Sequence, residues 1–303
     1  MTSIASPAVA EPSAARNRLV LVIYTAAIFV SALLLFSVQP LFTKMVLPRL
    51  GGSPAVWSVA MVFFQALLLA GYAYAHFLTQ LRSRVLPIAL HLLLLGFALL
   101  TLPLSISSHW GDPPTSGYAL WLLGLFTVSI GLPFFALAAN NPLLQAWFVR
   151  TGHPAGPDPY FLYASSNIGS FLALLSYPLL IEPIFSLRMQ NMIWTGGYAV
   201  LIALIAGCGV LLLRAPVAVM ALLPRVDGDA PAPNWLLRAR WIFLAAVPSG
   251  LLIAVTAHIS TDVAAAPLLW VLPLSLYLLT WVLVFQSRPL LPHKWMLALQ
   301  PLA

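Results

Sequence analysis

Charged side chains are scarce in this 303-residue sequence, which contains 14 Lys+Arg and 7 Asp+Glu, or 7% of its residues. Soluble domains carry about 25% charged residues. Hydrophobic residues make up 61% of the chain, and the mean hydropathy is +0.97. A water-soluble globule of this length could not cover its surface with so few charges. The composition therefore excludes a cytosolic enzyme, a nucleic-acid-binding protein and a disordered chain.

Cysteine is almost absent as well, and the one residue, Cys208, excludes an internal disulfide framework and a cysteine-based zinc site. It lies between Gly207 and Gly209 in an apolar run, so we expect a small packing residue there. The sequence also lacks a His-Glu-x-x-His pattern, a Gly-x-Ser-x-Gly pattern, a nucleotide-binding fingerprint and an acidic pair at useful spacing. We expect no catalytic residue, no metal and no cofactor in this chain.

Long apolar runs are what the sequence has instead. A helix needs about 20 mostly apolar residues to cross the hydrocarbon core, where no water satisfies its backbone. The stretches that meet this length are 19–38, 55–78, 85–104, 118–139, 160–181, 191–213, 241–259 and 264–286. The sequence therefore predicts an all-α polytopic transmembrane helix bundle of about eight spans, with the lipid bilayer as its main partner.

The basic residues indicate how this bundle is oriented. With the N-terminus inside, three of them fall outside: Lys44, Arg49 and Arg188. The others fall on the cytoplasmic side: Arg16, Arg18, Arg82, Arg84, Arg150, Arg214, Arg225, Arg238, Arg240, Arg288 and Lys294. Cytoplasmic loops of membrane proteins carry an excess of Lys and Arg. We therefore expect both termini in the cytoplasm.

Two tails flank the predicted spans. Residues 1–18 are rich in Ala, Ser and Pro, a composition typical of disorder. In the tail 287–303, the basic and aromatic residues 292–295 precede a mostly apolar stretch. This stretch is either the first turns of a further span, as in a fragment of a longer protein, or a short helix lying on the membrane surface.

Prolines predict breaks in several of the helices. Many lie inside or at the ends of spans, among them Pro133, Pro178, Pro248, Pro267 and Pro273. Each removes a backbone donor, and transporters use such broken helices to line binding sites, although they are also common in membrane helices without a site.

Two further segments containing proline predict helix ends. Residues 39–54 predict an interfacial or re-entrant helix that ends at Gly51-Gly52, after the first span. Asn140-Asn141-Pro142 predicts the end of the fourth span. We therefore expect helix breaks at both places.

Polar residues inside the spans predict helix contacts. Gln65 must face another helix, because a lone amide in lipid is costly. In the fifth span, small residues spaced four apart favour close helix packing: Ser165 with Gly169, and Ser166 with Ser170. Asn167 in the same span either ties two helices together or contacts a solute.

A group of polar residues converges on the predicted outer face: Gln39, Lys44, Arg49, Glu182, His258 and Asp262. Lys44 and Arg49 either contact an anionic ligand or extend to lipid headgroups. His258 and Asp262 are four residues apart, which places them on one helix face as a proton-responsive pair, unless Asp262 caps the eighth span. With Asn167, four of these residues are our candidate ligand contacts: Gln39, Glu182, His258 and Asp262.

Several motifs carry a family resemblance. In the first half these are FSVQPLFTK (36–44), LGGSPAVW (50–57), FFQ (63–65) and GYAYAH (71–76). In the second half they are YASSNIGS (163–170), PLL (178–180), HISTDVA (258–264) and LWVLPL (269–274). The chain resembles the membrane-spanning part of bacterial integral membrane proteins described as fused transporter/spermidine-synthase-like, and the resemblance covers nearly all of it.

The resemblance implies a bacterial inner-membrane location. In that family, further spans and a soluble aminopropyltransferase-like domain follow the membrane part. The glycine-rich turn and the aspartate that such a domain needs are missing here, so the chain alone is not expected to synthesise spermidine. The loop after the second span also lacks the aspartate of the major-facilitator signature.

Two functions follow as expectations. The first is a transporter-like module that handles a small solute, and the carboxylates would suit a polyamine-like cation. The second is a membrane anchor or regulator for an aminopropyltransferase-like catalytic domain on a longer or neighbouring polypeptide. A membrane enzyme acting on lipid-linked substrates would need clustered catalytic groups, which the spacing does not show.

Overall fold

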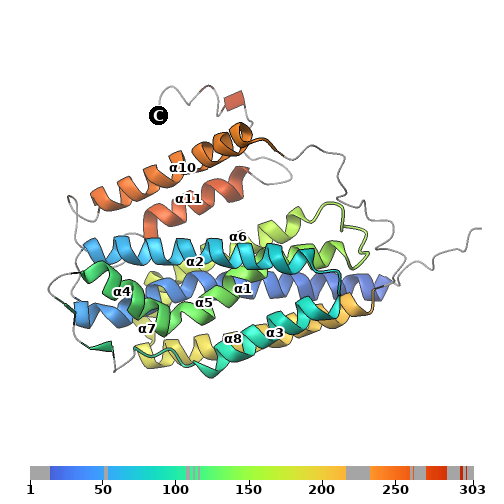
Figure 1. The fold of residues 1–303 in the computed structure, drawn as a ribbon, viewed down its shortest axis with the longest axis horizontal. Coiled ribbons are helices and arrows are strands. Elements are labelled where there is room, and N and C mark those ends of the chain that lie inside the picture. Colours follow the sequence, from blue (N-terminus) through green and yellow to red (C-terminus); the bar gives the residue numbers. More distant parts are fainter. Residues whose placement is uncertain are drawn as a thin grey trace, which may run out of the picture.

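Helices form all of the regular secondary structure in the described part of the computed structural model, which confirms the predicted all-α class (Figure 1). The structure describes residues 14–50, 54–106, 110–111, 113–114, 117–215, 233–259, 262, 271–284, 294–295 and 298. The helices are α1 (Ala14–Leu50), α2 (Pro54–Gln80), α3 (Val85–Leu100), α4 (Tyr118–Phe126), α5 (Leu132–Val149), α6 (Tyr160–Ser176), α7 (Glu182–Ile184), α8 (Leu187–Leu213), α10 (Trp235–His258) and α11 (Val271–Val284). Two π-helical turns, η2 (Thr127–Gly131) and η3 (Tyr177–Ile181), join α4 to α5 and α6 to α7.

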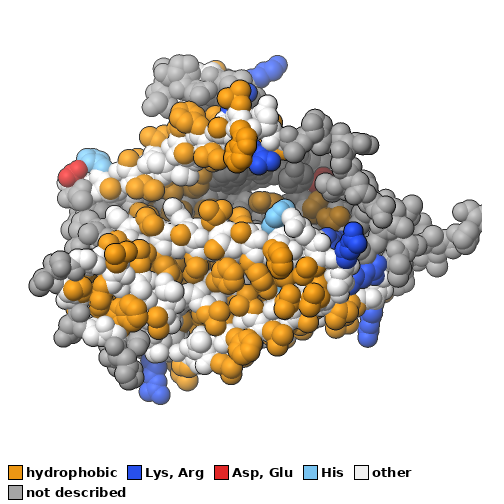
Figure 2. All heavy atoms as spheres, viewed as in Figure 1, with side chains coloured by type: hydrophobic (Ala, Val, Ile, Leu, Met, Phe, Trp, Pro, Cys, Tyr) orange, Lys and Arg blue, Asp and Glu red, His pale blue; other side chains and the backbone are white. Residues whose placement is uncertain are grey.

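Six helical segments in the described ranges are long and apolar enough to cross a membrane: Ala14–Pro48, Ser58–Gln80, Tyr118–Val149, Phe161–Ile184, Leu187–Leu213 and Trp235–His258. Two further apolar helices are shorter, Val85–Leu100 and Val271–Thr280. Apolar side chains also cover much of the exposed surface between the ends of the bundle, as a lipid-facing surface requires (Figure 2).

The first helix differs from its prediction. We expected a span over 19–38, a disordered tail up to residue 18 and a separate helix after Gln39, but α1 is one helix from Ala14 to Leu50 that contains Pro40 and Pro48. Its length, about 55 Å, exceeds the hydrocarbon thickness of about 30 Å. Buried Val38, Phe42 and Val46 pack on both sides of Pro40, so tertiary contacts hold the helix together through the proline. Residues 1–13 and Gly51-Gly52 lie outside the described residues.

The predicted helix stop at Asn140-Asn141-Pro142 is also wrong, because α5 continues to Val149. Asparagine ends helices when its side chain bonds to nearby backbone. Here the Asn140 and Asn141 side chains bond to other helices instead, as described below. Pro133 and Pro178 lie at or in the π-helical turns η2 and η3, where the chain stays helical rather than breaking. Pro248 lies inside α10, and Pro267 lies outside the described residues.

The core surrounds α1, which packs against α5, α6 and α8 (Figure 1). Aromatic rings fill the space where α1, α2 and α4 meet: Phe126 makes edge-to-face contacts with Phe42 and Phe63 at centroid distances of 5.2 and 5.4 Å. The helices α10 and α11 lie beside this bundle, with α11 against α6. Among the described residues of α10, Thr256 is the buried one, so α10 packs only lightly on the bundle.

Candidate functional site

A cavity of about 210 Å³ fills the space between α1 and α2 on one side and α10 and α11 on the other. Phe134 of α5 also lines it. Most of the lining is apolar, from Leu, Phe, Met and Ile side chains. Five polar residues interrupt it: Gln39, Gln65, Ser249, Thr256 and Tyr277. An apolar cavity with a few convergent polar groups is the usual form of a small-molecule site.

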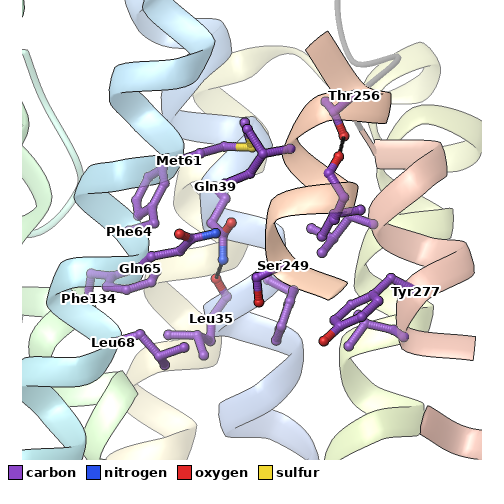
Figure 3. Close-up of a pocket in the computed structure, with 15 residues that line it drawn as sticks. Leu35, Gln39, Met61, Phe64, Gln65, Leu68, Phe134, Ser249, Thr256 and Tyr277 are labelled. Atoms are coloured by element: carbon purple, nitrogen blue, oxygen red, sulfur yellow. Dashed lines mark hydrogen bonds between the residues drawn. The ribbon is translucent and has the colours of Figure 1, made fainter. Parts of the chain in front are cut away.

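The two glutamines come from neighbouring helices and point toward one another inside this cavity (Figure 3). The Gln39 Nε2 donates to the backbone oxygen of Leu35, one turn earlier on α1, at 3.4 Å. The Gln65 amide makes no hydrogen bond to another described residue. Unpaired polar groups in an apolar setting are costly, so the Gln65 amide and the Gln39 carbonyl oxygen are available to a bound molecule or water.

The hydroxyl groups lie on the opposite wall of the cavity. Ser249 Oγ donates to the backbone oxygen of Ala245 at 2.9 Å, and Thr256 Oγ1 donates to that of Leu252 at 2.6 Å. Each hydroxyl keeps lone pairs that can accept a hydrogen bond. None of the described lining residues is charged, so the cavity suits neutral polar groups.

Four of the predicted outer-face residues pair two by two in the described part of the structure. Lys44 Nζ and Glu182 Oε1 form an ion pair that joins α1 to α7, and each side chain is about one third exposed. This pair neutralises the Glu182 carboxylate that we assigned to a cationic solute. The Arg49 side chain lies outside the described residues.

His258 and Asp262 form a pair of their own. His258 Nδ1 lies 2.6 Å from Asp262 Oδ2, and both side chains are more than 60% exposed. The spacing of four residues brings them together as expected. Neither residue lines the cavity, although Thr256 on the same helix does.

The fifth predicted span packs closely on α1. Ser165 Oγ donates to the backbone oxygen of Thr25 at 3.1 Å, and a Cβ atom on Gly169 would lie 2.6 Å from the backbone oxygen of Phe29. Ser170 Oγ donates to the backbone oxygen of Ser166 at 2.9 Å. The small residues therefore lie where α6 meets α1.

Asn167 lies on the same helix as these small residues but is half-buried. It makes no side-chain hydrogen bond to another described residue, and it is not part of the cavity lining.

A buried polar network was missed by the sequence reasoning. The fully buried His91 of α3 donates from Nε2 to Asn140 Oδ1 at 2.6 Å, and Asn140 Nδ2 donates to Ser31 Oγ on α1 at 2.9 Å. The next residue continues the pattern, since Asn141 Nδ2 donates to Ser166 Oγ on α6 at 3.1 Å. A histidine in the middle of the apolar run 85–100 was the available signal.

Arginines gather at the opposite end of the bundle from Lys44 and Glu182. Arg150 donates to the backbone oxygen of Thr79 at 2.8 Å, and Arg84 donates to that of Ala215 at 3.0 Å. Arg16 donates to the backbone oxygen of Thr151 at 3.3 Å. Burial and the neighbouring Arg84 lower the pKa of Arg150. The accepting carbonyl groups lie at or just after the C-terminal ends of α2, α8 and α5, where positive charge complements the helix dipoles.

His153 lies at the same end, in the turn that follows α5. The backbone N–H of Ala155 donates to His153 Nδ1 at 3.0 Å, and the ring packs on Phe148 at 5.1 Å. Burial lowers the pKa of His153, partly opposed by a hydrogen bond with the backbone of Asn17. The neutral imidazole is therefore the form that this turn accommodates.

Comparison of the chain with protein-family models, with curated proteins and with solved structures finds no match.

Proposed function

We propose that this chain is a multi-pass membrane protein, a transporter-like module that binds a small solute in the cavity between α1–α2 and α10–α11. The observation that carries the proposal is the pair of glutamine amides, Gln39 and Gln65, that face one another in an otherwise apolar cavity. Neither amide ties two helices together through a hydrogen bond between described residues. A bound solute gives both amides partners.

The proposed topology has eight crossings in a bacterial inner membrane, with both termini in the cytoplasm. The α3 helix rises about 24 Å over its 16 residues, so the adjoining residues would complete its crossing. The contacts of Arg16, Arg84 and Arg150 place basic residues together at one end of the bundle. This gathering supports a cytoplasmic assignment for that end.

The solute class depends on which residues it reaches. A polyamine-like cation would bind at Glu182 in place of the Lys44 ammonium, or at Asp262 beside His258. A neutral solute would bind at Gln39 and Gln65 and needs no displacement of an ion pair. The uncharged lining of the cavity favours the neutral solute.

A thermal-unfolding screen in lipid nanodiscs tests the proposal, with the intrinsic fluorescence of the 10 tryptophans as the signal. The panel contains small amines, primary amides and alcohols. The test variant is Ser249→Phe, which fills the cavity from α10. Its matched control is Leu251→Phe, since Leu251 is 61% exposed on the same helix and does not line the cavity.

We expect at least one panel member to raise the Tm of the wild type and of Leu251→Phe by about 2–4 °C, and to leave Ser249→Phe unchanged. Equal shifts in all three proteins would place binding outside the cavity. No shift with any member would contradict solute binding and favour the alternative role, a membrane anchor for an aminopropyltransferase-like domain.

A further inference from the structure

We infer that the ligand of this cavity is an amphipathic molecule with a neutral hydrogen-bonding head and an apolar chain, and that it enters sideways from the lipid between α2 and α10. The inference rests on the proposed function and names the ligand class of the same site.

The entrance lies between two lipid-facing surfaces. Figure 2 shows a hollow between α10 and the bundle below it. On α2, Val62 and Leu69 are 57% and 71% exposed, and both are neighbours in sequence of residues that line the cavity. On α10, Val255 is exposed as well, and its neighbour in sequence, Thr256, lines the cavity. A molecule that reaches the cavity between these helices therefore crosses apolar surface rather than water.

The depth of the amides agrees with this route. The apolar span of α2 begins at Ser58, and Gln65 comes seven residues later. At 1.5 Å per residue, Gln65 therefore lies about 10 Å into the span. A charged head would lose its hydration at this depth without gaining a counter-charge, because no described lining residue is charged. A neutral head exchanges hydrogen bonds with the two amides instead.

The amides determine which heads can bind. Each primary amide offers two N–H donors and one carbonyl acceptor, so the facing pair can satisfy a head that both donates and accepts. Primary amides, carbamates and hydroxy esters have this property. The volume of about 210 Å³ lies below the roughly 300–1,000 Å³ of sites for drug-sized ligands, so it holds the head and the first part of a chain. The rest of the chain would extend through the lateral opening into lipid.

Three probes separate this inference from the broader proposal. Decanamide has a neutral head on a ten-carbon chain, decylamine has a charged head on the same chain, and 1,4-diaminobutane is charged and water-soluble. Thermal unfolding in nanodiscs is measured for the wild type and for Gln39→Met/Gln65→Met, which keeps the side-chain length but removes the amides. Gln80→Met, at the exposed end of α2, is the matched control.

We expect decanamide to raise the Tm of the wild type and of Gln80→Met by about 2–4 °C, and the double variant to lose at least half of this shift. Should the double variant fold poorly, the single variant Gln65→Met is tested instead. The native Gln65 side chain makes no hydrogen bond to another described residue, so this substitution removes none. A shift with 1,4-diaminobutane or decylamine and none with decanamide overturns the inference but keeps solute binding. No shift with any probe overturns both.

Discussion

Lys44 on α1 and Glu182 on α7 form an ion pair across 138 residues of sequence. The pair joins α1 to α7, the short helix that follows α6 and η3, at the end of the bundle opposite the arginines. We predict that Lys44→Met and Glu182→Gln each lower the free energy of unfolding by no more than about 1 kcal/mol, because both side chains are one third exposed and partly screened. The double variant should cost less than the sum of the two. Strictly additive losses in a double-mutant cycle would mean that the pair contributes nothing.

Gly169 is the point where α6 approaches the backbone of α1. A Cβ atom there would lie 2.6 Å from the Phe29 oxygen, and backbone cannot move aside as a flexible side chain can. We predict that Gly169→Ala lowers the free energy of unfolding in detergent by about 1–3 kcal/mol. The matched control is Gly196→Ala on α8, since a Cβ atom at Gly196 meets no atom within 4 Å. Equal stabilities of the two variants would contradict the close approach.

The buried pair of His91 and Asn140 gives a third prediction. His91→Leu leaves the Asn140 carbonyl oxygen without its donor in a fully buried place, which should cost about 1–3 kcal/mol of unfolding free energy. His91→Gln retains a donor and should recover part of this loss. His76→Leu, the same change at an exposed site on α2, should have little effect. The measurement is SDS-induced unfolding, and an unaffected His91→Leu protein would show that the network does not stabilise the bundle.

The lowered pKa of His153 leads us to predict that the stability of the protein depends on pH. Burial lowers its pKa from the ordinary value of 6.5, so the unfolded chain binds the proton more readily than the folded one. Its contribution to stability is therefore complete above pH 6.5 and is lost as the pH falls below that value. Protonation of Nδ1 would also remove the acceptor of the Ala155 N–H. We predict that the Tm of His153→Gln falls less than that of the wild type between pH 7.5 and 5. Parallel pH profiles would exclude this role.

The helical class of the molecule followed from composition, because apolar runs of 20 residues can satisfy their backbone in lipid only as helices. The helix ends were harder to predict. Pro40, Pro48 and Pro142 look like breaks when read locally, yet packing around α1 and the contacts of Asn140 and Asn141 keep these helices continuous. Local patterns contain no information about such contacts between distant residues.

The candidate site shows the same limit. The sequence placed Gln39 just after the first predicted span and Gln65 in the second, but it did not bring them together, because their approach depends on how α1 and α2 pack. Spacing alone did pair His258 with Asp262, since residues four apart share a helix face. Spacing could not show that Lys44 would form an ion pair with Glu182. Nor could it show that Ser249 and Thr256 would line the wall of the cavity opposite the two glutamines.

The most direct test of the account is the accessibility of a spin label at Gln65 in a lipid bilayer. In a Cys208→Ala background, which removes the single native cysteine, Gln65→Cys and Leu69→Cys are labelled and their collisions with oxygen and with a water-soluble nickel chelate are compared. Leu69 is the lipid-facing control on the same helix, at 71% exposure. We predict that both labels collide with oxygen far more than with nickel, because Leu69 faces lipid and the proposed opening of the cavity at Gln65 also leads to lipid. Frequent nickel collisions at Gln65, with few at Leu69, would show a cavity open to water and contradict entry from the lipid. Frequent nickel collisions at both positions would contradict the placement of α2 in the membrane.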